Sequence, residues 1–425
     1  MESESKPSHR TRNVVIGIIV AAALIVVGII AVGLLWAGGD QEAGLATLEG
    51  TSVDESALPV TVPFDFVAGH IVVEATFADG DEPVTLIVDS GAPTILSDDL
   101  ADQFGDEVAG HLETAAIDGT VVKEEIVPVA KLRLGDATFT EVGSIKGFLE
   151  PDNPLSCISS NGLIGASLMK EAVWQIDYGT NQITIAPSVD GLDHIEGAIA
   201  LGFVSPTASS PSPQLPLLAG EGTLNFMIDT GSDGSIMISP ADLAGIGMEV
   251  DPSGPAFGTE AAGSAGSYDA RLLYAGVDLE LGNQELDGFP VATIESLQAG
   301  QGNIGNAFMS NYVVTIDWPQ GNIYFDPGSD DPRPPVPPAA TIGWDGERIT
   351  VGGVVEGSDV AEAGLAIGQL VSSIDGQDVS AAPRDDFCEL YVAERRDDGF
   401  ELTTDGGQIY QVGPVEDFYE PLSGG

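Results

Sequence analysis

Short apolar runs separated by turn residues dominate the chain from residue 59 onward. Two of them are HIVVEATF and VTLIV, and the turn-forming sequence ADGD lies between them. Short runs that are rich in Val and Ile and bounded by Asp and Gly predict β-strands. The chain has 425 residues, so we expect a mostly β protein made of two to four domains.

The N-terminus departs from this pattern. Residues 14–36 form an uncharged apolar run of 23 residues, long enough for a helix to span a bilayer. Basic residues precede the run and acidic residues follow it: Lys6, Arg10, Arg12, Asp40 and Glu42. The positive-inside rule then predicts a cytoplasmic tail at 1–13, a single-pass transmembrane helix in the cell membrane, and an extracytoplasmic remainder. A cleaved signal peptide is the alternative, but its apolar region is normally shorter, so we favour an uncleaved anchor.

The net charge excludes some classes of binding partner. Lys and Arg number 14 and Asp and Glu number 66, which gives a formal net charge of −52. Such a surface repels the phosphates of nucleic acids and the anionic headgroups of lipids, so we expect no nucleic-acid partner and no adsorption to a membrane surface. The carboxylates are spread along the chain, which indicates a solvated surface rather than an acidic tail.

Cysteine and histidine are too scarce for several common kinds of site. Cys157 and Cys388 are the only cysteines, which excludes a disulfide-rich scaffold and a cysteine-rich zinc site. The sequence leaves open whether these two form one bridge. Four histidines are scattered, and neither HExxH nor GxSxG occurs. Zinc-peptidase and α/β-hydrolase chemistry therefore lack their residues, and we expect no metal or organic cofactor.

Changes in composition divide the rest of the chain. Residues 37–58 are small and acidic and predict a stalk, whereas two Pro-rich stretches predict extended linkers. The resulting units are a first block at 59–204, a linker at 205–216, a second block at 217–327, a linker at 328–338 and a C-terminal block at 339–420.

The first two blocks are copies of one unit. LIVDSGAPTIL matches FMIDTGSDGSI, GLIG matches GNIG, and WQIDYGTNQITI matches VTIDWPQGNIYF. All three pairs have the offset that separates Asp89 from Asp229, which is 229 − 89 = 140 residues. A fourth pair, LRLG and LELG, has an offset of 282 − 135 = 147 residues, as expected when surface loops differ in length between copies.

One aspartate occupies the same place in each copy. Asp89 and Asp229 each follow three apolar residues, which places them at the end of a buried strand where the chain enters a turn. The glycine two positions later, Gly91 or Gly231, lets the backbone turn sharply and lets the facing copy approach closely. Two carboxyls brought together share one proton, so one can act as a base on water and the other as an acid on a carbonyl.

The motif hydrophobic-hydrophobic-Asp-(Ser/Thr)-Gly-(Ala/Ser) resembles the active-site motif of the pepsin and retropepsin aspartic peptidases. Each copy also resembles that family in a later hydrophobic-hydrophobic-Gly segment, at 163–165 and 303–305, although Asn303 departs from the apolar pattern. The resemblance covers residues 59–327 and implies a bilobal fold of the bacterial type, with two pseudo-symmetric β-barrel-like lobes and a site that closes within a monomer. It implies Asp89 and Asp229 as the catalytic pair, supported by the other loop residues: Ser90, Gly91, Ala92, Thr230, Gly231 and Ser232.

The two loops differ at their fourth position. Ser232 can donate a hydrogen bond near Asp229, whereas Ala92 offers no hydroxyl to Asp89. A donor favours the ionised form of a carboxyl. We therefore hypothesise that Asp89 carries the shared proton and that Asp229 carries the charge.

The same family covers its cleft with a β-hairpin flap. Residues 114–125 contain an Asp-Gly turn between strand-like runs, which implies a flap at Ile117, Asp118 and Gly119. The tyrosine of the pepsin flap is absent from this segment. Residues 258–272 occupy the equivalent interval of the second copy.

The C-terminal block resembles a PDZ domain. Residues 349–379 contain the Gly-Ser turn, the Ala-Gly-Leu helix end and the Ile-Asp-Gly hairpin of that small α+β fold. PDZ domains bind the C-terminus of a peptide by strand addition, and the resemblance implies Ile342, Gly343 and Trp344 as the loop that holds the carboxylate. A packing module that binds no peptide is the alternative.

These observations predict a membrane-anchored aspartic endopeptidase that acts on a polypeptide substrate. A catalytically silent receptor, which would bind peptides in the cleft and in the PDZ groove, is the alternative from another class. A zymogen that needs processing within residues 38–58 is a third.

Overall fold

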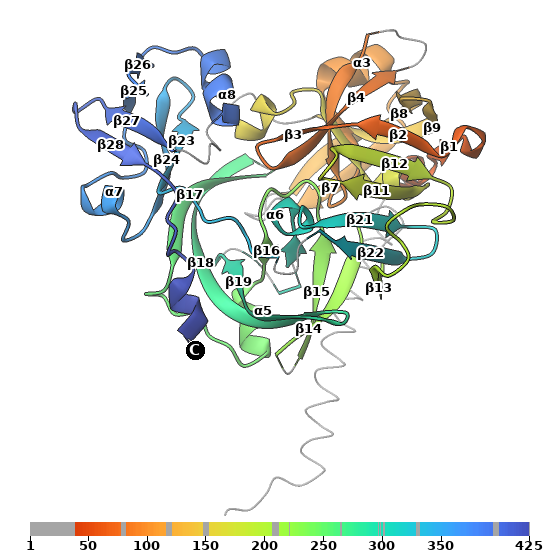
Figure 1. The fold of residues 1–425 in the computed structure, drawn as a ribbon. Helices are drawn as coiled ribbons and strands as arrows, with labels where there is room; N and C mark the ends of the chain where they lie inside the picture. Colours follow the sequence, from red (N-terminus) through yellow and green to blue (C-terminus); the bar gives the residue numbers. More distant parts are fainter. Residues whose placement is uncertain are drawn as a thin grey trace, which may run out of the picture.

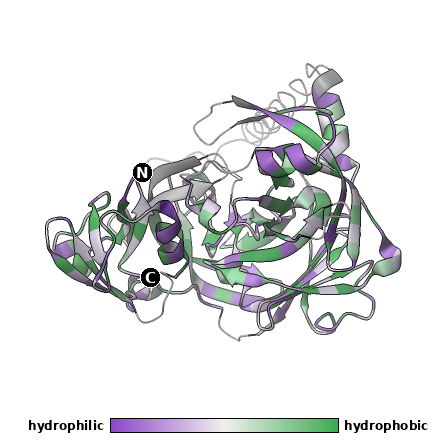
Figure 2. Cartoon of the chain, turned by 90° about the horizontal axis from the view of Figure 1, so that it is seen from above, coloured by the Kyte–Doolittle hydropathy of each residue, from purple (hydrophilic) through white to green (hydrophobic). Residues whose placement is uncertain are grey.

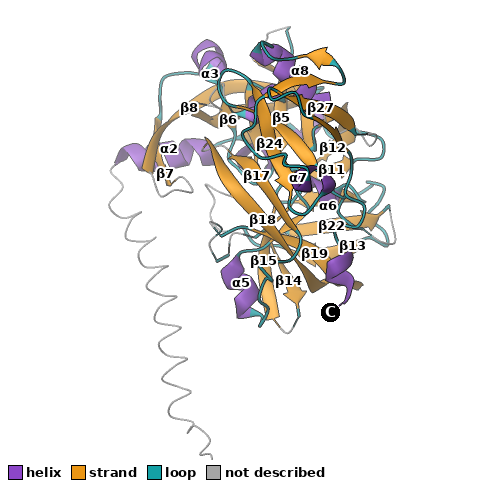
Figure 3. Cartoon of the chain, turned by 90° about the vertical axis from the view of Figure 1, so that its left-hand side faces the viewer, coloured by secondary structure: helices purple, strands orange, loops and turns teal. Residues whose placement is uncertain are grey.

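The computed structural model describes most of the chain after residue 38 (Figure 1). The described ranges are 39–77, 82–115, 121–147, 153–205, 212–220, 222–263, 266–295, 297, 299–300, 302–328, 332–393 and 399–424. Among these residues no helix is both long and apolar enough to cross a membrane, and the predicted span at 14–36 lies outside them. Strands predominate and the helices are short, as Figure 3 shows.

Each copy of the repeat builds one large sheet. In the first lobe the strand order is β1-β9-β6-β10-β5-β4-β8-β7, and β3 pairs with β4. These strands are β1 (Ser52–Val53), β3 (Asp65–Val67), β4 (His70–Phe77), β5 (Val84–Asp89), β6 (Ile95–Leu96), β7 (Gly110–Ala115), β8 (Val121–Leu134), β9 (Ala137–Lys146) and β10 (Gly162–Gly165).

The second lobe repeats the central part of this arrangement. Its strands follow the order β14-β15-β20-β16-β19-β18-β17. They are β14 (Gln214–Ala219), β15 (Gly222–Ile228), β16 (Ile236–Met237), β17 (Ala256–Gly263), β18 (Gly266–Leu281), β19 (Gln284–Thr293) and β20 (Asn303–Ile304). In both lobes the strand that leads to the aspartate, β5 or β15, pairs in parallel with the strand of the hydrophobic-hydrophobic-Gly segment, β10 or β20.

A third sheet joins the two lobes. Its order is β13-β22-β21-β11-β12-β2, so the middle pair, β21 and β11, comes from different lobes. In this antiparallel pair Gln175 lies opposite Thr315, its own counterpart at the 140-residue offset, and its Nε2 donates to Thr315 Oγ1 at 2.9 Å. An approximate two-fold axis therefore passes through this residue pair. The strands are β2 (Val60–Pro63), β11 (Val173–Asp177), β12 (Gln182–Ala186), β13 (Ile199–Gly202), β21 (Tyr312–Asp317) and β22 (Asn322–Pro327).

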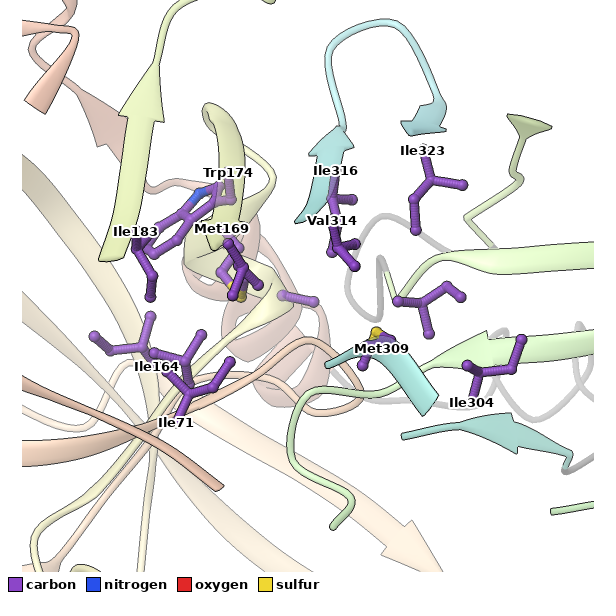
Figure 4. Close-up of a cluster of buried hydrophobic side chains, with 14 of the residues drawn as sticks. Ile71, Ile164, Met169, Trp174, Ile183, Ile304, Met309, Val314, Ile316 and Ile323 are labelled. Atoms are coloured by element: carbon purple, nitrogen blue, oxygen red, sulfur yellow. The ribbon is translucent and has the colours of Figure 1, made fainter. Parts of the chain in front are cut away.

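One hydrophobic core runs through both lobes behind these sheets. Figure 4 shows equivalent side chains from the two copies within it, among them Ile164 and Ile304, Met169 and Met309, and Ile183 and Ile323. Hydrophobic and hydrophilic residues alternate along the strands in Figure 2, as expected for sheets with one face on a core. Burial of this apolar surface is the main driving force that holds the lobes together.

From residue 39 onward, the predicted stalk at 37–58 is instead folded onto the first lobe. Helix α2 (Gly39–Glu49) packs against β7, β8 and β9, and the side chain of Leu48 is fully buried. The chain then forms β1, which pairs with β9, and the short helix η1 (Glu55–Ala57). Small acidic composition led to the stalk prediction, but Gly44 and Leu48, one helical turn apart, form a buried face on this helix.

The predicted linker at 205–216 is also structured where it is described. Val204 and Gln214 form a β-bridge, and Gln214 begins strand β14. Pro213 O accepts a hydrogen bond from Ile228 N at 2.9 Å, so this segment lies beside the strand that leads to Asp229. Pro216 is tolerated in β14 because this strand pairs with β18 only at Leu218 and Ala219, so the missing N–H removes no hydrogen bond on that side.

Short helices complete the two lobes. They are α3 (Asp98–Phe104), η2 (Pro154–Cys157), α4 (Ala166–Met169), α5 (Pro240–Gly245) and α6 (Asn306–Met309). Ser97 and Ser239 cap α3 and α5 by accepting a hydrogen bond from the backbone N–H three residues later.

We call residues 339–420 the C-terminal module, drawn in blue in Figure 1. It has its own apolar core. Its elements are β23 (Ala340–Trp344), β24 (Ile349–Val355), α7 (Asp359–Glu362), β25 (Val371–Ile374), β26 (Gln377–Asp378), α8 (Arg384–Ala393), β27 (Phe400–Thr404) and β28 (Ile409–Val412), and η3 (Glu420–Gly424) ends the described chain.

The C-terminal module contacts both lobes. Strand β24 pairs with β17, so the sheet of the second lobe continues into the module. On the other side, Cys388 of α8 forms a disulfide with Cys157 of η2, with the Cα atoms 4.9 Å apart. Arg384 Nη2 also donates to Asn153 O at 2.9 Å and to Ser156 Oγ at 2.7 Å. The pairing that the sequence left open is thus a bridge between the module and the first lobe.

Replacing Cys388 with serine should lower the stability of the folded chain. The bridge joins residues 231 apart, and a crosslink of this kind contributes about 2–4 kcal/mol, mainly by restricting the unfolded chain. Thermal unfolding of the parent should therefore respond to a reductant, whereas the C388S and C157S variants should not. Peptide mapping without reductant that finds both thiols free would contradict the bridge.

Candidate active site

The structure places Asp89 and Asp229 at equivalent points of the two lobes. Asp89 is the last residue of β5, and Asp229 directly follows β15. Gly165 of β10 lies opposite Asp89, and Asp229 N donates to Ile304 O of β20 at 3.0 Å. Each aspartate is therefore fixed by a parallel strand pair inside its own lobe.

Glycine at the third motif position allows the two loops to meet. A Cβ atom added to Gly231 would lie 2.3 Å from Asp89 Cγ, and one added to Gly91 would lie 2.6 Å from Asp229 Oδ1. No side chain can occupy either space. Each carboxyl thus lies directly against the glycine of the opposite lobe, which is the close approach that the sequence predicts.

A second pair of glycines lies beneath the loops. A Cβ atom on Gly165 would come within 2.1 Å of the Pro93 carbonyl carbon, and one on Gly305 within 2.4 Å of Gly234 O. These contacts are with backbone, which cannot move aside. Only glycine therefore fits at the end of each hydrophobic-hydrophobic-Gly segment, because the aspartate loop of the same lobe packs directly on it.

Reciprocal hydrogen bonds connect the two loops across the pseudo-two-fold axis. Ser90 N donates to Thr230 Oγ1 at 2.9 Å, and Thr230 N donates to Ser90 Oγ at 3.0 Å. The same hydroxyls donate onward, Ser90 Oγ to Ile228 O at 2.7 Å and Thr230 Oγ1 to Val88 O at 2.9 Å. Both side chains are fully buried, so each hydroxyl satisfies backbone groups of the opposite lobe that water cannot reach.

Asn306 adds a further link between the lobes. Its Nδ2 donates to Thr230 O at 2.7 Å and to Gly69 O at 2.9 Å, and its Oδ1 accepts from Tyr178 Oη at 2.7 Å. The counterpart of Asn306 in the first copy is Ala166, which has no polar side chain. The sequence therefore indicated this residue, because position 306 is polar and its counterpart in the other copy is apolar.

Hydrogen bonds to the carboxyl oxygens differ between the two aspartates. Gly91 N donates to Asp89 Oδ1 at 2.8 Å, and Gly231 N donates to Asp229 Oδ1 at 3.1 Å. Asp229 Oδ2 also accepts from Asn303 Nδ2 at 3.0 Å. That side-chain donor has no equivalent in the first lobe, because the counterpart of Asn303 is Leu163.

The surroundings of the two carboxyls affect their pKa values differently. Burial raises the pKa of Asp89, and the nearby negative charge of Asp229 raises it further. Burial also raises the pKa of Asp229, but the hydrogen bonds from Asn303 and Gly231 oppose that rise. The hydrogen bonds from Asn303 and Gly231 therefore favour the charged form of Asp229.

The structure changes the donor on which the hypothesis of a proton on Asp89 rests. Ser232 Oγ accepts a hydrogen bond from Gly234 N at 3.3 Å, which closes its own turn. Asn303 provides the side-chain donor to Asp229 instead. In the sequence this residue was visible only as a departure from the apolar pattern.

Ser212 is a supporting residue that the sequence did not indicate. Its side chain is buried, and its Oγ donates to Gly91 O at 3.0 Å. It lies in the Pro/Ser-rich stretch predicted as a linker, where serine carried no distinguishing signal.

The proposed flap residues Ile117, Asp118 and Gly119 lie outside the described residues. The strands on either side of them, β7 and β8, pair as an antiparallel hairpin up to Ala115 and Val121. The equivalent hairpin of the second lobe, β17 and β18, instead pairs with β24 of the C-terminal module. The two copies therefore use this hairpin differently.

The segment predicted to be the carboxylate loop of a PDZ domain is a strand of the C-terminal module. Gly343 pairs with Thr350 inside the β23–β24 ladder. Ile342 and Trp344 are buried in the core of the C-terminal module. Ile342 and Trp344 support the sheet because their apolar side chains are needed for its packing. Gly343 allows the two strands to lie close together, since a Cβ atom there would be 2.9 Å from Gly352 Cα.

Within the described residues, no group of three or more His, Cys, Asp or Glu side chains is placed to hold a metal ion.

Removing the hydroxyl of Thr230 should destabilise the fold. In a Thr230→Val variant, Ser90 N and Val88 O lose their partner in a buried site, at a cost of about 1–3 kcal/mol for each group. Thr230→Ser, which keeps the hydroxyl and loses one methyl, is the matched control and should cost about 1 kcal/mol. Urea unfolding measures both. Equal losses in the two variants would show that the cross-lobe hydrogen bonds contribute little.

Comparison with known proteins agrees with this geometry over part of the chain. Residues 73–168, from β4 to α4, match the model of the family described as aspartyl protease. The match includes Asp89 and the segment that ends at Gly165. No curated protein matches the chain. The family match supports an aspartic-protease-like domain and a peptidase role for this part of the protein.

Proposed function

We propose that this chain is an aspartic endopeptidase that hydrolyses polypeptides with a water molecule activated between Asp89 and Asp229. The observation that carries this proposal is the contact of each carboxyl with the glycine of the opposite lobe. The family match covers one copy of the repeat, and the second copy provides the other carboxyl in the same chain.

The division of the proton assigns a role to each carboxyl. Asp229, as the anion, takes a proton from the water whose oxygen forms a bond to the scissile carbonyl carbon. Asp89 gives its proton to the carbonyl oxygen, which produces a neutral gem-diol. In the second step Asp229 passes its proton to the amide nitrogen, the C–N bond breaks, and a gem-diol hydroxyl returns a proton to Asp89. The pair ends in its starting state, and no cofactor takes part because water is the nucleophile.

Replacement of either aspartate tests this proposal directly. Asp89→Asn and Asp229→Asn should each reduce cleavage of a denatured protein by at least about 10²–10⁴-fold, because each removes one half of the acid–base pair. Asp287→Asn is a matched control, since it removes one carboxyl from an exposed position of β19.

The assay uses the full chain from acidic to neutral pH, with and without high salt, since the net charge of −52 makes activity sensitive to screening. Cleavage that persists in both dyad variants would exclude the mechanism. No cleavage by the parent in any buffer would favour the silent peptide receptor.

The pH dependence of cleavage should follow the raised carboxyl pKa values. The active form holds one proton, so the acidic limb of the profile marks ionisation of Asp229 and the basic limb marks loss of the proton from Asp89. Burial raises the pKa of both groups, so both limbs should lie above the ordinary aspartate value of about 3.9. We expect a bell-shaped profile of kcat/KM displaced towards neutral pH; a maximum at or below that ordinary value would count against it.

We also propose that the peptidase lies outside the cytoplasm, anchored by residues 14–36. The disulfide between Cys157 and Cys388 supports this location, because such bridges persist in oxidising compartments. Sequencing the N-terminus of the protein isolated from membranes distinguishes an uncleaved anchor, a removed signal peptide and a zymogen processed within 38–58. Peptide binding by the PDZ-like module stays a prediction.

A further inference from the structure

One of the pairs of equivalent positions at which the two halves of the site differ lies directly beside a carboxyl. Asn303 lies on β20 opposite Met227, and Leu163 lies on β10 opposite Ile87. The positions are 303 − 163 = 140 residues apart, which is the offset of the repeat. A carboxamide therefore lies beside one carboxyl at the place where the other copy has a purely apolar side chain.

The hydrogen bond that Asn303 donates favours the charged form of Asp229 over the neutral form. Its Nδ2 donates to Asp229 Oδ2 at 3.0 Å, while Gly231 N donates to Oδ1, so both oxygens of Asp229 accept hydrogen bonds. On the first lobe the donors to Asp89 are the backbone N–H groups of Gly91 and Ala92. Leu163, 5% exposed, contributes no donor. Hydrogen bonds donated to a carboxyl favour its charged form, so donors on both oxygens make Asp229 easier to ionise.

We propose that Asn303 is a positioning residue that fixes the negative charge of the carboxyl pair on Asp229 and leaves the shared proton on Asp89. The consequence for catalysis rests on the proposed function: Asn303 determines which aspartate is the base and which is the acid. Asn303 acts through Asp229 and contributes no proton of its own.

Other groups also face Asp229. Asp89 lies across the axis, and His70 on β4 lowers the pKa of Asp229 through its positive charge. Both residues stay in place in the parent, in Asn303→Leu and in the exchange variant below, so their influence is common to these three proteins. A change in titration between these proteins then reports on Asn303.

The experiment titrates the aspartate carboxyls of the full chain by NMR, with a carbon-13 label at Cγ. The Asp89→Asn and Asp229→Asn variants identify the two resonances. In the parent, Asp229 should ionise at lower pH than Asp89. In Asn303→Leu, which introduces the side chain of the other lobe, the titration midpoint of Asp229 should rise by about one pH unit, because one hydrogen bond to the charged form is lost.

An exchange variant separates this role from simple packing. The double change Leu163→Asn and Asn303→Leu moves the donor to the first lobe, so Asp89 should become the first to ionise. Thermal unfolding of each variant runs in parallel, since a merely structural Asn303 would alter stability without altering the order of titration. Midpoints for Asp229 that are the same in parent and Asn303→Leu would overturn the proposal.

Catalysis provides an independent readout. The acidic limb of the kcat/KM profile should move to higher pH in Asn303→Leu, with the basic limb nearly unchanged, because the variant affects ionisation of Asp229 first. If the parent cleaves no substrate, the proposed function fails, and the NMR titration still decides the role of Asn303.

Discussion

The reciprocal hydrogen bonds between Ser90 and Thr230 are the contact on which the rest of the site depends. Each buried hydroxyl satisfies backbone groups of the other lobe, so neither loop is complete without its partner. With the loops held together, only glycine fits at positions 91 and 231, and the carboxyls enter the space that side chains would fill. The same contact thereby fixes where the carboxyls lie and partly shields them from water, which raises the pKa of both.

Symmetry brings the two carboxyls together, and departures from symmetry make them different. The axis through Gln175 and Thr315 relates the strands, the loops and the paired core residues of the two lobes. The polar residues Asn303 and Asn306 break it, since their counterparts are Leu163 and Ala166. The periphery is asymmetric as well, because the C-terminal module pairs with β17 of the second lobe and is crosslinked to η2 of the first. An ancestral pair of equal lobes can acquire separate acid and base roles through a few such positions.

The sequence was sufficient to predict the features that are local or repeated. Apolar runs gave the strands, and the 140-residue offset indicated two related lobes with Asp89 and Asp229 at equivalent points. Features that depend on contacts between distant segments were missed. Leu48 docks α2 on the first lobe, and Ser212 reaches the loop of Asp89, although both lie in segments whose composition resembles a stalk or a linker. The sequence favours Ser232 as the donor to Asp229, because the two residues are close in sequence. Strand pairing instead brings Asn303 to Asp229 from 74 residues away.

The central claim is that Asp89 and Asp229 form one unit that holds a single proton. Neutron diffraction from a crystal of the protein near neutral pH locates that proton directly. The account predicts carboxyl oxygens of the two residues within hydrogen-bonding distance, with one proton between them bonded to Asp89. Two separated carboxylates, each without a proton, would contradict it.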